Sequence, residues 1–149
     1  MRITIASFLK GGKTPFAASE EEYIKRLAPH TAVELVALRA DRDRRLPDGM
    51  TRAAHVIGLD AAGRCFDSEG LAARVGKLMG QGRSRLVFAV GGPEGMPAEV
   101  EPQLAERWSL SPLTFSHQLA RLLLLEALYR SYDILVGGRR YHRGPPRNS

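Results

Sequence analysis

The sequence predicts an α/β domain in which helices flank a mainly parallel sheet. Apolar, strand-like runs alternate along the chain with segments of helical spacing, an order typical of parallel sheets. The clearest strand, residues 85–90 (RLVFAV), is apolar without alternation, as expected for a strand covered on both faces. Because 149 residues match the usual size of one domain, we expect residues 1–149 to form a single domain.

The first elements follow from this pattern. Arg2 to Leu9 has a strand pattern, and Ser19 to Leu27 is predicted to be a helix that begins at a serine cap, with acidic residues in its first turn. Ala32 to Leu38 alternates apolar and polar residues and is predicted to be the second strand. From Arg39 to Arg52 arginines mix with aspartates, proline and glycine, which indicates a polar loop or frayed helix. Its charges largely cancel, so we expect a solvated face there rather than an RNA-binding patch.

The remaining elements precede and follow the strand at 85–90. The helix before that strand is expected to end at Gly80 and Gly82. In chain order we predict a strand over His55 to Leu59, a helix over Ser68 to Met79, a modest helix over Ala98 to Glu106, a short strand over Arg107 to Leu110 and a strong helix over His117 to Tyr132.

The last of these helices is apolar around more than one face. Its leucines require packing partners on two sides, and we expect the second partner to be another subunit, which predicts a homodimer. Glu126 and Arg130 are spaced four apart on this helix and are expected to pair.

Composition restricts the compartment and the partners. The single cysteine, Cys65, excludes an internal disulfide and a cysteine zinc cluster, and we expect no metal. The N-terminal residues show no signal-peptide pattern, and the longest apolar stretch, Leu122 to Leu125, is too short to span a bilayer, so we expect a soluble, cytoplasmic protein without membrane association. A net charge of +6 favours an anionic partner.

Gly11-Gly12-Lys13-Thr14, after the first strand, is similar to the end of a phosphate-binding P-loop. That motif requires a further glycine where this chain has Ser7, so the phosphate cradle is incomplete. A plain turn is the better interpretation. A nucleotide hydrolase that depends on Lys13 stays open as an alternative.

A second candidate, Gly91 to Gly95, follows the clearest strand directly. Ligands of open α/β sheets gather beyond the carboxyl ends of the strands, and glycine lets the backbone approach a ligand closely. The spacing is not the GxGxxG of dinucleotide-binding folds. A tight structural turn and a ligand-binding loop are equally good interpretations of this motif alone.

A third candidate is the segment from Trp108 to His117 (WSLSPLTFSH), a short strand that leads through hydroxyl-rich residues into the strong helix. Backbone donors near a helix N-terminus, together with apolar side chains, suit an adenosine with its ring and hydroxyls. The alternative is an elaborate helix cap, with Ser116 or Thr114 as the capping residue and His117 merely in the first turn.

A fourth candidate is the basic cluster near the C-terminus, Arg139-Arg140-Tyr141-His142-Arg143. Arginines pair with phosphates, and aromatic rings stack on exposed bases, so the cluster suits RNA. Taken alone, a disordered basic tail explains it better.

Together these motifs resemble the SPOUT superfamily of α/β-knot methyltransferases, and within it the family of ribosomal RNA large subunit methyltransferase H. The resemblance covers essentially the whole chain and rests on GGPEG at 91–95, SLSPLTFSHQLARLLLLEALYR at 109–130 and YHR at 141–143. It implies an α/β knot, with a C-terminal trefoil knot. It also implies a homodimer that uses S-adenosyl-L-methionine to methylate N3 of a pseudouridine in 23S ribosomal RNA, with the assembled ribosome as the substrate we expect.

The resemblance also implies roles for individual residues. His142, with Tyr141 and Arg143, matches the C-terminal motif that completes the active site, and we expect Arg143 or Arg121 to steady charge that develops on the uracil. Arg139, Arg140 and Arg147 are expected to contact phosphates. The residues implied to line or shape the cofactor pocket are Leu59, Gly91, Gly92, Gly95, Leu110, Ser111, Pro112, Leu113, Thr114 and Phe115.

Two other functions stay open at this point. One is a SPOUT methyltransferase that acts on a different RNA nucleotide. The other is a dimeric RNA-binding protein without catalysis, which would retain the basic tail and bind no methyl donor.

Overall fold

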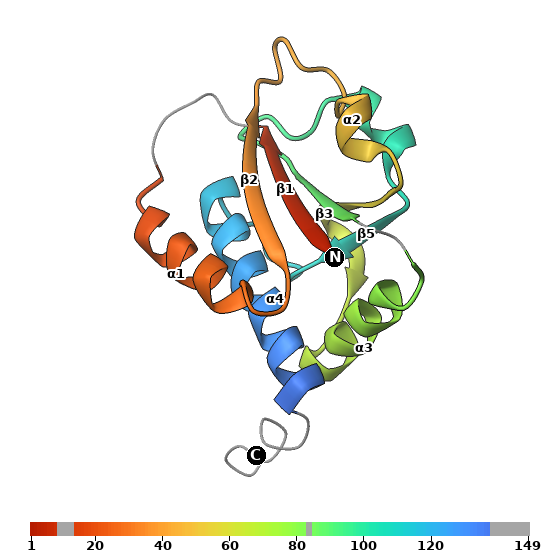
Figure 1. The fold of residues 1–149 in the computed structure, drawn as a ribbon. Coiled ribbons are helices and arrows are strands. Elements are labelled where there is room, and N and C mark those ends of the chain that lie inside the picture. Colours follow the sequence, from red (N-terminus) through yellow and green to blue (C-terminus); the bar gives the residue numbers. More distant parts are fainter. Residues whose placement is uncertain (9–13, 83–84, 138–149) are drawn as a thin grey trace.

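A computed structural model describes residues 1–8, 14–82 and 85–137, which form a five-stranded sheet with helices on both faces (Figure 1). The strand order is β2-β1-β4-β3-β5, and every neighbouring pair is parallel. The prediction of a mainly parallel sheet flanked by helices is therefore confirmed. The strands are β1 (Arg2–Phe8), β2 (Ala32–Leu38), β3 (Ala54–Cys65), β4 (Arg85–Val90) and β5 (Glu106–Ser109).

The central strands β1 and β4 are buried on both faces, as the unbroken apolar run of β4 predicts. Their register sets Ile3 beside Leu86 and Ile5 beside Phe88, all four fully buried. Alternate residues of the same strands, such as Ala89, face a second core on the other side of the sheet. The sheet is thus the middle layer of three.

The two faces are covered unequally. One carries three long helices, α1 (Ala17–Leu27), α3 (Ser68–Met79) and α4 (His117–Gly137), whose apolar side chains join the larger core. The other is covered by the segment around Leu46 and two short helices, α2 (Asp48–Thr51) and the 3-10 helix η1 (Ala98–Gln103). Figure 1 shows α2 beside η1, away from α1 and α4.

Helix α4 packs against both α1 and α3 as well as the sheet. The chain itself therefore supplies the two packing partners that its leucine-rich sequence requires. The prediction of a second subunit cannot rest on that requirement alone.

Several element boundaries differ from the sequence prediction for local reasons. Helix α1 begins at Ala17, so Ser19 lies inside it and is not the cap. The N-cap position is Phe16, whose N–H donates to the Thr14 Oγ1 at 3.1 Å in the turn before the helix. The helix predicted over 98–106 is a 3-10 turn that ends at Gln103, because Pro102 has no N–H to donate. Helix α4 runs five residues beyond Tyr132, with the buried Ile134 continuing its apolar face.

Strand β3 is longer than the predicted segment. Its pairing with β5 is interrupted after Leu59 and resumes at Arg64. The residues in between are largely exposed, so they carry no apolar pattern that sequence reasoning could detect.

The charge-rich segment 39–52 is a solvated face, as predicted. It is a loop that ends in the short helix α2, and its arginines meet acidic partners at the surface. The exposed ion pairs are Arg39 with Asp41 (3.1 Å), Arg44 with Glu99 (3.0 Å) and Arg45 with Asp48 (3.7 Å).

Within the ranges that the structure describes, none of the helices combines the length and the apolar character needed to cross a bilayer. In the same ranges, His, Cys, Asp and Glu side chains form no group of three that could hold a metal ion.

Candidate functional site

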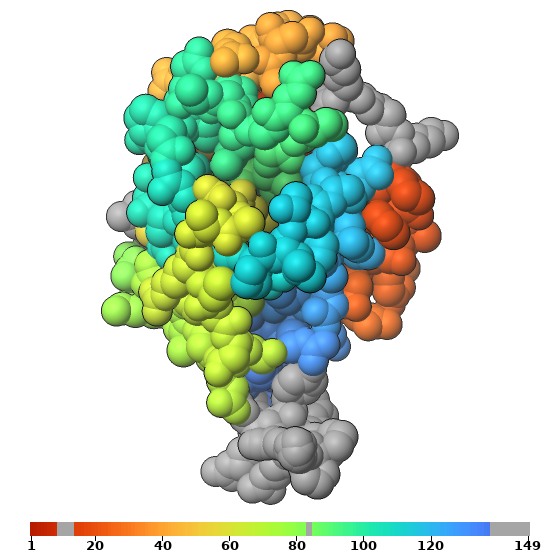
Figure 2. All heavy atoms as spheres, turned by 180° about the vertical axis from the view of Figure 1, so that it is seen from behind, coloured from red at the N-terminus to blue at the C-terminus, as the bar shows by residue number. Residues whose placement is uncertain are grey.

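The glycine loop at 91–95 and the segment after Trp108 meet in one pocket at the carboxyl edge of the sheet. The pocket is an open hollow with a cavity volume of about 170 Å³. In Figure 2, the segments that form it lie side by side on one face: β3 near residue 60 in yellow, the glycine loop in green and residues 110–117 in cyan. The lining residues are Leu59, Asp60, Ala61, Val90, Gly91, Gly92, Leu110, Ser111, Leu113, Thr114, Phe115, His117 and Ala120.

Strand order explains why these segments converge. Strand β3 lies between β4 and β5, and all three run in the same direction. The residues that leave β4 at Val90 and β5 at Ser109 therefore emerge on either side of Leu59. This is the edge where parallel α/β sheets bind ligands.

The glycine loop is both a tight turn and a pocket wall. The Gly95 N–H donates to the Gly92 carbonyl at 2.9 Å, and the Gly92 N–H donates to the Gly95 carbonyl at 3.3 Å. Gly95 has φ +83°, a left-handed conformation that favours glycine. A Cβ on Gly91 would lie 3.0 Å from the Gly95 carbonyl carbon and 3.1 Å from the Met96 nitrogen, so a side chain at that position would force the loop backbone to shift by a few tenths of an ångström.

The hydroxyl-rich segment is held by its own serines. The Ser109 hydroxyl donates to the Ser111 carbonyl at 2.9 Å, and the Leu113 N–H donates to the Ser111 hydroxyl at 3.0 Å. The Leu119 N–H donates to the Ser116 hydroxyl at 3.2 Å, so Ser116 caps α4, one of the two predicted capping residues. Thr114 lies on the pocket wall instead. The segment is therefore a helix cap and a pocket wall at once.

His117 belongs to the third candidate segment, but it was not among the residues implied for the donor, and its alternative interpretation was a first-turn residue of the helix. It lines the pocket together with Ala120, three residues later on the same helical face. Burial, and secondarily the nearby Arg121 charge, lower the pKa of His117 below its usual value. A neutral ring at pH 7 can accept a hydrogen bond or a proton from a ligand.

Asp60 adds a carboxylate to the pocket and was also missed. Its Oδ1 accepts a hydrogen bond from the Ala62 N–H at 2.9 Å, and its Oδ2 lies 3.8 Å from Arg107 Nε. A strand that ends in aspartate at the carboxyl edge of a sheet is a signal that could have identified it.

Three predicted site residues lie elsewhere among the described residues. Pro112 is exposed and does not line the pocket, while Gly95 shapes the loop and lines a separate hollow on its other side. Arg121 is buried, with its guanidinium against Glu20, so the expected direct contact with substrate is not supported by its position. The predicted residues of the C-terminal cluster, Arg139, Arg140, Tyr141, His142, Arg143 and Arg147, lie outside the described residues, as do Gly11 to Lys13.

A neighbouring hollow with a cavity volume of about 130 Å³ shares Leu110 with the pocket. Its walls include Trp108, the N-terminal turn of α3 and the Glu126–Arg130 ion pair of α4, which confirms the predicted pairing. The two hollows therefore lie on either side of the segment that follows β5.

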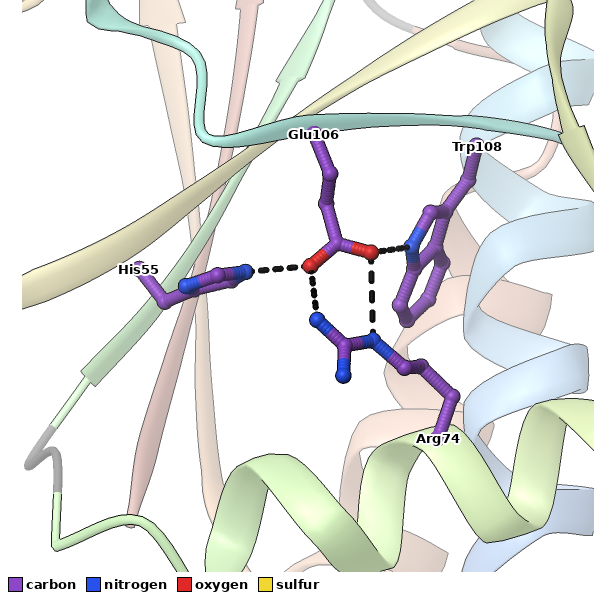
Figure 3. Close-up of polar contacts among 4 residues, drawn as sticks. All are labelled: His55, Arg74, Glu106 and Trp108. Carbon is purple, nitrogen blue, oxygen red and sulfur yellow. Dashed lines mark hydrogen bonds and ion pairs between the residues drawn. The ribbon is translucent and has the colours of Figure 1, made fainter.

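A part-buried carboxylate network holds the start of β5 in place (Figure 3). Glu106 accepts hydrogen bonds from Trp108 Nε1 at 2.7 Å, from His55 Nε2 at 2.5 Å and from both Arg74 Nε (3.2 Å) and Arg74 Nη2. Burial raises the pKa of Glu106, but these donors outweigh it and hold the pKa at about 2. The network joins β3, α3 and β5 just before β5 enters the pocket segment.

We expect Glu106→Gln to lower the free energy of unfolding at pH 7 by about 2 kcal/mol, allowing for partial solvent screening, since hydrogen bonds to a charged group contribute about 1.5–3 kcal/mol. The folded-state pKa lies below the ordinary 4.5. The stabilisation from ionised Glu106 is therefore complete above about pH 4.5 and is lost as the pH falls toward 2. Urea unfolding at pH 7, 4 and 3 measures both effects.

Glu99→Gln is the matched control, because Glu99 is exposed and pairs only at the surface with Arg44. Its unfolding free energy should stay close to that of the wild type. A stability difference between wild type and Glu106→Gln that is the same at every pH would contradict the assigned role of the carboxylate.

Comparison with known proteins identifies the family of this chain. The family model described as predicted SPOUT methyltransferase matches residues 1–142. Relatives named ribosomal RNA large subunit methyltransferase H are similar along most of their length. The relative from Sorangium cellulosum is 34% identical over 140 residues, covering 92% of this chain and 97% of the relative. Those from Xanthomonas campestris pv. campestris (42%) and Stenotrophomonas maltophilia (40%) align over 136 residues, 82% of this chain and 86% of each relative. The chain therefore belongs to the ribosomal RNA large subunit methyltransferase H family of SPOUT methyltransferases.

Proposed function

We propose that this protein transfers a methyl group from S-adenosyl-L-methionine to N3 of a pseudouridine in 23S ribosomal RNA of the large subunit. The observation that carries the proposal is the pocket itself, in which Gly91, Gly92 and six of the residues between 110 and 117 lie around one hollow beside Leu59. The names of the relatives indicate ribosomal RNA as the substrate, and the matching family model indicates methyl transfer as the reaction.

The chemistry of the pocket fits the proposed donor. Its walls are largely apolar, with Leu59, Val90, Leu110 and Phe115 available to the adenine ring. The loop backbone, Thr114 and the Asp60 carboxylate offer polar groups for the ribose hydroxyls and the amino group of the methionine moiety. Ten residue positions were implied for the donor by family resemblance, and eight of them line this pocket.

When bound, S-adenosyl-L-methionine supplies a methyl group on a sulfonium, which is already a good electrophile. The chain therefore has to align the acceptor nitrogen and remove its proton, and alignment can contribute roughly 7–11 kcal/mol in well-oriented systems. We assign proton removal from N3 to His142, charge stabilisation at the uracil oxygens to Arg143 and stacking on the base to Tyr141. These three residues lie outside the described ones and are assigned by family resemblance.

The proposal includes a cytoplasmic homodimer, with the C-terminal trefoil knot of the family. Exposed apolar side chains support an interface: Leu113 is 70% exposed and Val136 is 68% exposed. Arg139, Arg140 and Arg147 are assigned to RNA phosphates, in keeping with the net charge of +6.

The experiment that tests the function combines binding with product mapping. Isothermal titration with S-adenosyl-L-methionine should show saturable binding. Incubation with the labelled donor should place the label on a 23S pseudouridine, with assembled ribosomes as better substrates than isolated subunits or free RNA. Label on another nucleotide would contradict the proposed target nucleotide. A protein that binds RNA without binding the donor would overturn the enzymatic function.

A further inference from the structure

A buried ion pair lies directly behind the pocket. Glu20 of α1 is 2% exposed and Arg121 of α4 is 7% exposed. Arg121 Nε donates to Glu20 Oε2 at 2.7 Å, and Arg121 Nη2 donates to Glu20 Oε1 at 3.0 Å. Such a two-point contact between a guanidinium and a carboxylate fixes orientation as well as distance.

The pair also reaches the sheet at the pocket edge. Arg121 Nη1 lies 3.5 Å from the Ser7 hydroxyl, and Ser7 is the register neighbour of Val90, which lines the pocket. The guanidinium therefore connects α1, the first turns of α4 and the carboxyl end of the central strands.

The first turns of α4 contribute His117 and Ala120 to the pocket. Arg121 follows Ala120 directly and is four residues after His117, so it is the helical neighbour of that ring. The rest of α4 is apolar around most of its circumference, and apolar contacts alone do not define the rotation of a helix about its axis. The directional contact with Glu20 does define it.

We propose that the Glu20–Arg121 pair is a positioning pair for the methyl-donor pocket, which fixes the rotation of the first turns of α4 and so holds His117 and Ala120 on the pocket wall. This inference rests on the proposed function. Arg121 is therefore a positioning residue that acts through α4, without touching the donor or the RNA.

A contribution to the free energy of unfolding does not by itself explain why a buried ion pair lies at this position. The cost of removing two charges from water offsets much of their attraction, and well-packed apolar replacements are often neutral or stabilising. A role in geometry makes a distinct prediction, because it affects donor affinity in molecules that are fully folded.

The test measures the dissociation constant for S-adenosyl-L-methionine in Glu20→Gln, Arg121→Gln and Arg121→Lys, at a temperature where near-UV circular dichroism shows each variant folded. Each should bind the donor about 5- to 150-fold more weakly, the usual range for coupled sites. Lysine should not rescue binding, since a single ammonium cannot reproduce the two-point contact. The double variant with Glu20→Gln and Arg121→Gln should bind the donor no more weakly than the weaker-binding of the two single variants.

Glu22→Gln is the matched control on the same helix. Glu22 is exposed and pairs with Arg26 of α1 at 3.0 Å, so its loss should leave the donor affinity unchanged. Unchanged affinity in the folded Glu20 and Arg121 variants would overturn the proposal. If the single variants do not fold, the apolar pair Glu20→Leu with Arg121→Met replaces them, with the same weakened binding expected and unchanged affinity again contradictory.

A measurement without ligand separates this inference from the proposed function. Among the described residues, Arg121 on the same helix carries a charge close to the His117 ring, Glu20 pairs with Arg121, and Asp60 lines the same pocket as His117. In NMR spectra, the ring signals of His117 should shift in Arg121→Lys, which keeps the positive charge but loses the two-point contact with Glu20. An unchanged ring environment would reject the positioning pair. A wild-type protein that binds no donor, yet shows this change, would reject only the proposed function.

Discussion

Gly91→Val is expected to weaken binding of S-adenosyl-L-methionine by about 100-fold or more. A Cβ at this position would lie 3.0 Å from the backbone of Gly95 and 3.1 Å from that of Met96, and neither can rotate away as a side chain would. The Cβ alone requires the loop backbone to give by a few tenths of an ångström, and the two methyl groups of valine require more, so the loop moves against the pocket. Misplacement by about 1 Å can cost roughly 100-fold. Isothermal titration measures the affinity, and circular dichroism confirms that the variant is folded.

Gly49→Val is the control for this change. Gly49 lies in α2 on the other face of the sheet, where a Cβ would meet nothing within 4 Å. Its donor affinity should equal that of the wild type. Wild-type affinity in Gly91→Val would show that the glycine loop is only a turn, and the pocket would lose its assignment.

His142→Ala is expected to lower the turnover number by about 100-fold, since a positioned general base contributes about 100- to 10,000-fold. The donor affinity should stay nearly unchanged, because His142 is assigned to the N3 proton of the acceptor. Single-turnover methylation of assembled ribosomes measures the chemical step, and titration with the donor measures the affinity.

His30→Ala is the matched control for the histidine. His30 stacks on Tyr132 with ring centroids 5.6 Å apart, and it does not line the donor pocket. Its turnover number should match that of the wild type. A full single-turnover rate in His142→Ala would remove His142 from the mechanism and leave proton removal to another group, such as His117.

Much of the architecture could be predicted because local residue patterns determine where its strands and helices lie. The limits predicted for the strands at 32–38 and 85–90 and for the helix at 68–79 match the structure residue for residue. Each has a clear apolar pattern, periodic in 32–38 and 68–79 and continuous in 85–90. The Asp67 carboxylate also caps the helix through the Gly70 N–H at 2.7 Å. The errors occur where the local signal is absent or misleading, as in the polar continuation of β3 after Leu59.

The pocket was predictable only in part. The glycine loop and the hydroxyl-rich segment have distinctive residue types, and family resemblance joined them to one ligand. The residues missed, Asp60 and His117, are ordinary in sequence. They become pocket residues only because β3 lies between β4 and β5 in the sheet.

By itself, the amino-acid sequence determined the alternation of strands and helices, the buried central strand and the motifs of a methyltransferase family, because each depends on residues close together in the chain. Only the tertiary structure decided which motifs share a pocket, that Arg121 pairs with Glu20 across 101 residues, and that Glu106 holds β5 through His55, Arg74 and Trp108. The physical reason is that charged groups far apart in the chain leave no periodic pattern. Their partners are chosen by the packing of the sheet and its helices.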